Sequence, residues 1–167
     1  MISQNRHWFA LYTKPRNEFN AEKQLQSIGV KYFLPTINKV RQWSDRKKKI
    51  LEPLFRGYIF IYSDEKERLL ALELTSIVRC IFYNGKPAVI PESQIDNVKS
   101  ILKNNTDLDV HNRLFPGNKV IIKSGPLKGI VGVVLNSNRG KSIAISVDLL
   151  NRSVLTRLPE ESIVQAI

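Results

Sequence analysis

Two runs of β-branched residues, separated by a compact turn, occupy residues 117–134. Val120–Ile122 and Ile130–Val134 have the composition of strands, and Gly125, Pro126 and Gly129 supply the turn between them. We expect Gly125 and Gly129 to permit left-handed backbone in that turn. Gly132, inside the second run, permits a close backbone approach or a bulge. The segment therefore predicts two neighbouring antiparallel strands.

Further strand-like runs follow this pair, with turn signals at residues 136–140, at 151–152 and at Pro159. About five short strands within about 50 residues are typical of a small β-barrel that closes on itself. The pattern predicts a five-stranded barrel at residues 114–167.

The first 103 residues have a different pattern. Residues 8–14 alternate as a strand, Pro15 stops it, and a helix is expected to run to about Ile28, with Gly29 as its exit residue. Strand-like runs follow at residues 32–34, 37–43 and 54–62, and we expect the basic run at residues 45–49 to form a hairpin tip between the last two.

A second helix is expected to run from Ser63 or Asp64 to Leu74, because Asp64 and Glu67 have the spacing of a capping box. A strand at residues 78–82, a turn at Asn84-Gly85 and a helix at residues 92–103 complete this part. Interleaved strands and helices with more than one hairpin predict an α+β sandwich.

Residues 104–112 are mostly polar and lack a consistent period. The sequence thus predicts a first domain at residues 1–104, a linker at 105–113 and a second domain at 114–167. A length of 167 residues and a hydrophobic content of 43% are compatible with two small folded units.

The net charge of +11 is concentrated in the first third of the chain. Residues 1–57 carry 12 lysines and arginines against 4 acidic residues. The positive electrostatic field of such a segment raises the rate at which the protein encounters polyanions. This favours a position close to nucleic acid. A solvated basic surface without a ligand is the alternative.

Several function classes are disfavoured. No apolar run approaches the roughly 18 residues that cross a membrane, and we expect a cytoplasmic protein without membrane contact. The single cysteine, Cys80, lies in an apolar run and suits a buried thiol in a reducing compartment. His7 and His111 are isolated, and no nucleotide-binding or nucleophile motif is present. We therefore expect neither catalysis nor a cofactor or metal.

Residues 117–134 resemble the KOW motif. Together with Trp8-Phe-Ala-Leu-Tyr-Thr-Lys14, the Leu34-Pro35 pair and Glu52-Pro-Leu-Phe-Arg-Gly-Tyr-Ile-Phe60, they resemble the NusG family of transcription elongation factors over nearly the whole chain. Residues 8–103 are similar to the NusG amino-terminal domain, and residues 114–165 are similar to its SH3-like KOW domain. Arg41-Gln-Trp-Ser-Asp-Arg-Lys-Lys-Lys49 is similar to the UpxY antiterminators of capsular polysaccharide operons, and Glu52-Pro-Leu-Phe55 also resembles RfaH.

The resemblance implies a transcription antitermination or elongation factor that binds RNA polymerase at the β′ clamp helices. The contact residues implied are Tyr12, Tyr58 and Phe60. Strand parity independently predicts Tyr58, Phe60 and Tyr62 on one face if Ile59 and Ile61 face the core. If both faces are covered, these rings are ordinary core. A second contact, to the β gate loop, would come from residues 68–72.

The resemblance also implies a contact with non-template DNA or nascent RNA. Lys14 matches a family position beside the non-template strand, Arg16 and Lys23 lie on or near the first helix, and Arg46 and Lys47 lie on the hairpin. The KOW domain of the family binds NusE, a ribosomal protein, or Rho. The corresponding loop here contains Leu149, Leu150 and Arg152.

Three functions remain open at this point. The best match is an operon-specific factor of the capsular or exopolysaccharide type, acting as a monomer. A general NusG-type elongation factor is the second. A ribosome-associated KOW protein that binds RNA is the third, although proteins of that class lack the pattern of the first 100 residues.

Overall fold

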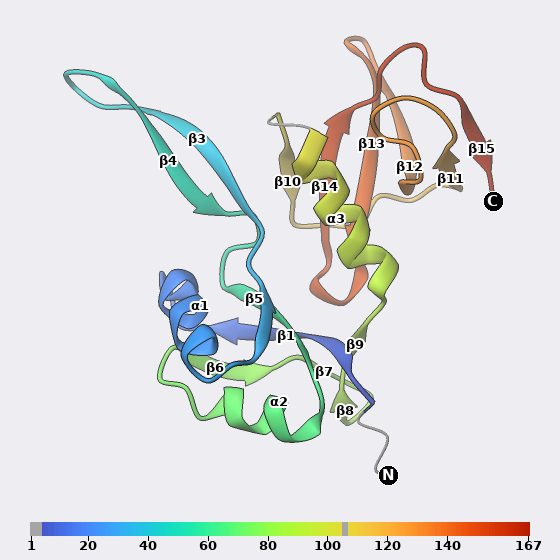
Figure 1. Cartoon of the computed structure of the whole chain (residues 1–167). Coiled ribbons are helices and arrows are strands. Elements are labelled where there is room, and N and C mark those ends of the chain that lie inside the picture. The colour runs from blue at the N-terminus through green and yellow to red at the C-terminus, as the bar shows by residue number, and fades with distance from the viewer. Residues whose placement is uncertain (1–4, 105–106) are drawn as a thin grey trace. The chain divides into compact units, whose positions relative to one another are not determined.

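The computed structural model describes residues 5–104 and 107–167. Contacts within the chain divide it into two compact units, one ending at Glu92 and the other beginning at Ser93. Each unit has its own antiparallel sheet (Figure 1). Within the described residues, no helix is both long enough and apolar enough to span a membrane.

The first unit is built on a sheet of strands in the order β2-β5-β1-β6, with β9 also paired to β1. The bounds are β1 His7–Thr13, β2 Lys31–Phe33, β5 Tyr58–Ser63, β6 Ile77–Cys80 and β9 Val89–Ile90. All of these pairings are antiparallel. The strand expected at residues 8–14 is therefore confirmed as β1, shifted by one residue.

Two helices, α1 (Glu18–Ser27) and α2 (Glu65–Leu72), cover one face of this sheet. Their buried side chains pack on those of the strands in one core cluster: Phe9, Leu11, Ala21, Leu25, Val30, Leu34, Ile59, Ile61, Ala71, Ile77 and Cys80. The capping box predicted at the start of α2 is confirmed, because the Asp64 carboxylate accepts a hydrogen bond from the Glu67 N–H while the Glu67 carboxylate accepts one from the Asp64 N–H. Gly29 follows α1 in the left-handed region, at a φ of 73°.

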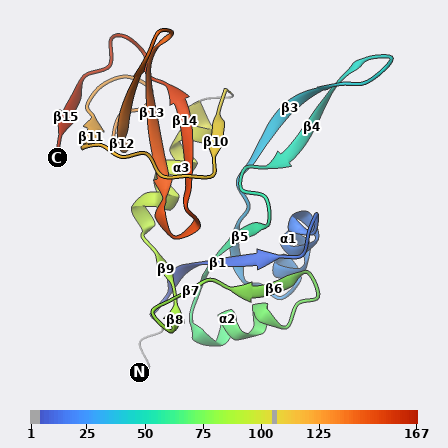
Figure 2. The same ribbon diagram turned by 180° about the vertical axis from the view of Figure 1, so that it is seen from behind.

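Two hairpins extend the first unit. β3 (Thr36–Gln42) and β4 (Lys47–Pro53) form a separate two-stranded ribbon that projects beyond the main sheet in both views (Figures 1 and 2). β7 (Phe82–Tyr83) and β8 (Lys86–Pro87) form a shorter one around the predicted Asn84-Gly85 turn.

The position of the basic run differs from the expectation. Lys47, Lys48 and Lys49 are part of β4, and the tip lies between Gln42 and Lys47. Residues 38–42 and 47–49 are exposed on both faces of the ribbon and show no alternation of polar and apolar residues, so the start of this strand gave no sequence signal.

The second unit contains α3 (Glu92–Asn104), apart from its first residue, and a six-stranded sheet in the order β10-β14-β13-β12-β11-β15. The strand bounds are β10 Asp109–His111, β11 Lys119–Ile122, β12 Val131–Ser137, β13 Gly140–Val147, β14 Arg152–Arg157 and β15 Val164–Ala166, with a short 3-10 helix, η1, at Asp148–Leu150. The strands predicted on either side of the turn are confirmed as β11 and β12.

The predicted roles of the glycines in and beside this turn are confirmed. Gly125 and Gly129 have φ values of 84° and 91°. A Cβ on Gly132 would lie 2.5 Å from the Ala144 carbonyl oxygen, which confirms the predicted close approach.

The segment expected to be a linker contains a strand. Residues 109–111 pair with β14, and the division by contacts lies after Glu92, so that α3 groups with the second sheet. Residues 105–106 lie outside the described residues. Only Val110 in this three-residue strand is apolar, which is too few positions for a periodic signal.

Candidate functional site

The sheet face opposite the two helices of the first unit is aromatic. The register pairs Tyr12 with Tyr58, Ala10 with Phe60 and Trp8 with Tyr62. Ile59 and Ile61 belong to the helix-covered core, so strand alternation places Tyr58, Phe60 and Tyr62 on the other face. The predicted parity of β5 is thus confirmed. We call this side of the sheet the aromatic face and define it by Trp8, Tyr12, Phe33, Tyr58, Phe60 and Tyr62, of which Trp8 and Phe60 are buried.

The rings of the aromatic face form contacting groups. Tyr12 and Tyr58 meet edge to face with centroids 5.5 Å apart, and Trp8 and Tyr62 lie 5.3 Å apart. Phe60 stacks on Phe33 at 6.1 Å. Such pairs add about 0.5–1.5 kcal/mol to the stabilisation from burial alone, so the rings hold one another in place.

Exposure separates Phe60 from the tyrosines. Phe60 has 0% exposure, and its ring also packs at right angles on Phe55, which follows Leu54 between β4 and β5. Tyr12 and Tyr58 are partly exposed. The sequence grouped Phe60 with the two tyrosines as contact residues, whereas the structure places its ring beneath the surface, because the segment before β5 folds back over it.

Tyr12 is held from two sides. The Arg79 guanidinium lies 5.7 Å from its ring centroid, and the backbone of Gly57 lies beneath its edge. Gly57 has a φ of 85°, and a Cβ there would lie 3.2 Å from Tyr12 Cε2. Neither Gly57 nor Arg79 was selected from the sequence. A glycine directly before a strand is a signal that could have identified the former.

Gly57 also joins three elements. Its N–H donates a 2.8 Å hydrogen bond to the buried Glu18 carboxylate of α1, and its carbonyl oxygen accepts a 2.8 Å hydrogen bond from the Thr13 N–H of β1. The backbone under Tyr12 is therefore fixed by hydrogen bonds in addition to packing.

Three of the predicted nucleic-acid contacts lie in the loop after β1 or on α1. Lys14, Arg16 and Lys23 are all exposed, and none forms an ion pair within residues 5–104 and 107–167. The Lys14 N–H donates to the Ser76 carbonyl oxygen at 2.9 Å, which fixes the backbone of this loop. Arg16 has a φ of 60°, a conformation that costs a non-glycine residue about 1–3 kcal/mol.

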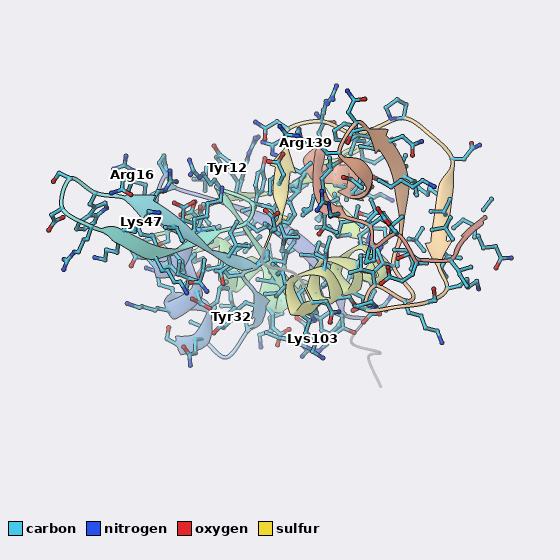
Figure 3. The ribbon with its side chains drawn as sticks, turned by 90° about the horizontal axis from the view of Figure 1, so that it is seen from above. Tyr12, Arg16, Tyr32, Lys47, Lys103 and Arg139 are labelled. Carbon is cyan, nitrogen blue, oxygen red and sulfur yellow. The ribbon has the colours of Figure 1, made fainter. Side chains whose placement is uncertain are left out.

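The other two predicted contacts lie on the β3–β4 ribbon. Lys47 is the first residue of β4 and is labelled on the ribbon in Figure 3. Arg46 lies in the tip, where its carbonyl oxygen accepts a 2.7 Å hydrogen bond from the Trp43 N–H. The structure therefore divides the predicted cations between two elements.

The α2 surface carries two exposed leucines, Leu69 and Leu70, at 50% and 44% exposure. Arg68 is instead buried and forms a two-pronged ion pair with Glu65, at 2.7 and 3.1 Å. The hydrogen bond from Arg68 lowers the pKa of Glu65, and burial raises the pKa of the neighbouring Cys80 thiol. The buried thiol expected at Cys80 is confirmed.

In the second unit, the predicted partner loop forms η1 and the start of β14. Leu149 and Arg152 are partly exposed, whereas Leu150 is only 4% exposed. Arg152 donates from its guanidinium to the Leu150 carbonyl oxygen at 2.9 Å, and Asn151 turns the chain with a φ of 52°. The 3-10 turn directs the Leu150 side chain into the interior. Leu150 was predicted to contact a partner, but its side chain does not lie on the surface.

The loop is also attached to α3. Gln94 Nε2 donates to an Asp148 carboxylate oxygen at 3.0 Å, and the Asp148 N–H donates to Gln94 Oε1 at 3.2 Å. Within the described residues, no group of three or more histidines, cysteines and acidic residues is arranged to hold a metal ion.

Comparison with known proteins identifies a family that matches this chain. A family model described as "Transcription termination factor nusG" matches residues 6–99. The solved structure "Domain interaction in Thermotoga maritima NusG" is 16% identical, covers 92% of this chain and 94% of its own, and has a TM-score of 0.53, which indicates a shared fold. The structure of the MjSpt4:Spt5 complex in conformation A is 13% identical over 96% of this chain and 97% of its own, with a TM-score of 0.29, which does not by itself indicate a shared fold. Because the family model covers more than half of the residues, the chain belongs to the NusG family.

Proposed function

We propose that the chain is a transcription antitermination factor that binds RNA polymerase and suppresses pausing and termination. Members of the NusG family act on transcription without catalysing a reaction, and the family binds RNA polymerase. Within the family we assign the chain to the operon-specific UpxY and RfaH type, working in the cytoplasm as a monomer. The aromatic face supports the proposal most strongly.

The polymerase contact is assigned to Tyr12 and Tyr58. They form a partly exposed pair whose geometry is fixed by Gly57, Arg79 and each other. Aromatic side chains that are rigid and half-exposed have the properties of interface anchors, since little conformational entropy is lost when they bind. Phe60 acts as the support beneath them. We assign the β′ clamp helices as the partner surface and Leu69 and Leu70 as a second contact, to the β gate loop.

The nucleic-acid contact is assigned to the exposed cations. Lys14, Arg16 and Lys23 have no ion-pair partner in the described residues, so their charge is available to phosphates. The strained backbone of Arg16 fits a position selected for contact, since such strain persists where the surroundings enforce it. Non-template DNA or nascent RNA is the partner of this group, and Lys14 is its central residue.

The effect on transcription comes from differential binding. A protein that makes and breaks no bond shifts polymerase between paused and active states only as far as it prefers one of them. A preference of about 1.4 kcal/mol for the active state changes that ratio about tenfold. Closing the first unit over the DNA channel provides such a preference, because the contact with the upstream strand forms only in the active geometry.

The second unit is assigned as a KOW domain that recruits a partner, NusE or Rho. Leu149 and Arg152 are its contact residues, with Leu150 as the buried support under the loop. This assignment predicts that the second unit matters only when its partner is present.

Direct binding to purified RNA polymerase tests the proposal. Alanine at Tyr12 and Tyr58 together should weaken binding by at least about thirtyfold, since one hot-spot aromatic typically contributes about 2 kcal/mol or more. Alanine at Trp43, an exposed aromatic residue on the ribbon, is the matched control and should leave the affinity within about twofold. Equal binding by wild type and the folded double variant would reject the tyrosine pair as the contact.

A further inference from the structure

The β3–β4 ribbon has one face that is exposed from the Asn38–Leu51 pair to the tip. The register places Val40 opposite Lys49, Gln42 opposite Lys47 and Asn38 opposite Leu51, and strand alternation puts all six side chains on the same face. We call it the open face and define it by Asn38, Val40, Gln42, Lys47, Lys49 and Leu51. Every member is exposed.

The opposite face is shielded at its base. Ile37 is buried there, and Ile50 and Glu52 are partly covered. Glu52 on β4 accepts hydrogen bonds at 2.6 and 3.1 Å from Arg41 on β3, which join the two strands. It also accepts one at 3.5 Å from Arg56, which ties the ribbon to the segment before β5. These contacts fix the base of a two-stranded ribbon that would have marginal stability alone.

The open face combines apolar, amide and cationic groups. Val40 and Leu51 are diagonal neighbours at 60% and 49% exposure, so this apolar surface remains open to solvent. Among the described residues, Asn38 makes no side-chain hydrogen bond, and Lys47 and Lys49 make no ion pair. Gln42 donates only to the Trp43 carbonyl oxygen, at 3.1 Å, which leaves its own amide oxygen free.

We propose that the open face of the ribbon enters the major groove of double-stranded DNA. This groove admits a two-stranded β-ribbon, its base edges pair with asparagine and glutamine amides, and the thymine methyl group suits an apolar side chain. Lys47 and Lys49 contact phosphates at the groove edge, Asn38 and Gln42 contact base edges, and Val40 packs on a methyl group. The inference rests on the proposed transcription role, which brings the chain beside duplex DNA.

The dimensions fit this partner. Asn38 and Gln42 are four residues apart, or about 13.6 Å along a strand at about 3.4 Å per residue. That distance corresponds to about four base pairs at a rise of about 3.4 Å. Duplex RNA does not offer the same site, because its major groove is deep and narrow. A ribbon that reads the groove should therefore bind duplex DNA in preference to duplex RNA.

Fluorescence anisotropy with the full chain tests the proposal. The probes are a labelled DNA duplex of about 24 base pairs, an RNA duplex of the same sequence and each single strand. We expect the DNA duplex to bind at least about tenfold more tightly than the RNA duplex. Glutamine at Lys47 and Lys49 should weaken DNA binding by at least about tenfold at 0.1 M salt and should reduce the salt slope by about 1.8, since two phosphate contacts are lost.

Glutamine at Lys66 and Lys86 is the matched control. Both lysines are exposed in the first unit, away from the ribbon, and the pair removes the same charge. This variant should retain DNA affinity within about threefold. Equal losses in the two double variants would indicate a diffuse field and overturn the proposal, as would equal or tighter binding to duplex RNA or to single strands.

Selection from a pool of random DNA duplexes tests base reading. The full chain should enrich a motif of about four base pairs, and alanine at Asn38 and Gln42 should abolish the enrichment while leaving salt-dependent binding intact. Polymerase binding, measured in parallel, separates the two proposals. If the wild-type chain binds polymerase but shows no preference for duplex DNA, the groove contact alone is rejected. If the wild-type chain does not bind polymerase, the transcription role is rejected.

Discussion

Alanine at Gly57 is the sharpest test of how the backbone positions Tyr12. Gly57 has a φ of 85°, and left-handed backbone costs an alanine about 1–2 kcal/mol relative to glycine. The new Cβ would also lie 3.2 Å from Tyr12 Cε2, so the ring must move by a few tenths of an ångström. We expect both a loss of stability and a loss of polymerase binding.

The stability loss is set by the backbone. A cost of about 1–2 kcal/mol corresponds to a fall in Tm of about 4–16 °C for a unit of this size. The binding loss is set by the ring: if the shift removes about half of the roughly 2 kcal/mol that a hot-spot aromatic contributes, the Kd rises about fivefold. Thermal unfolding and polymerase binding measure the two effects separately.

Alanine at Gly85 is the matched control. Gly85 has a φ of 75° in the same unit, and nothing lies within 4 Å of its added Cβ. This variant should lose a similar amount of stability while keeping full polymerase affinity. If both variants bind polymerase equally well, the reasoning that Gly57 fixes a functional Tyr12 is refuted.

Three further outcomes are expected. Because Cys80 is buried and burial raises the pKa of its thiol, a thiol reagent at pH 8 should modify it at least about 100-fold more slowly in the folded chain than in urea. The contribution of this thiol to the free energy of unfolding is present below pH 9.0 and falls as the pH rises through the raised pKa. Hydrogen bonding from Arg41 lowers the pKa of Glu52, so the carboxylate contacts that join β3 to β4 and hold the ribbon to Arg56 are present above pH 4.5 and are lost as the pH falls through the lowered pKa. Glutamine at Glu52 should therefore speed tryptic cleavage within the ribbon several-fold at pH 8 with little change in Tm. Alanine at Gly132 should destabilise the second unit by about 3 kcal/mol, measured by its denaturant midpoint, because the added Cβ would lie 2.5 Å from the Ala144 carbonyl oxygen.

Local chemistry predicted much of the fold. Some features depend only on residues close together in the sequence, and these could be predicted. They are the capping box at Asp64, the exit glycine after α1 and the left-handed turn glycines Gly125 and Gly129. The parity of β5 was also predictable, since Ile59 and Ile61 could share a core face only if the aromatic residues between and beside them faced away.

The missed features depend on contacts between distant segments. Phe60 is buried because Phe55 and Phe33 cover its ring, and alternation within β5 cannot show which of its two faces is covered. Leu150 is buried because a 3-10 turn redirects it. Arg79 and Gly57 surround Tyr12 only once β6 and the loop before β5 have assembled beside β1.

Pause lifetime is the measurement that tests the central claim most directly. With purified polymerase on a template carrying the native leader of its operon, the chain should shorten pause lifetimes about tenfold, which corresponds to a preference of about 1.4 kcal/mol for the active state. Alanine at Tyr12 and Tyr58 should remove the effect. If the wild-type chain binds polymerase on that template and pause lifetimes remain unchanged, the antipausing account is contradicted.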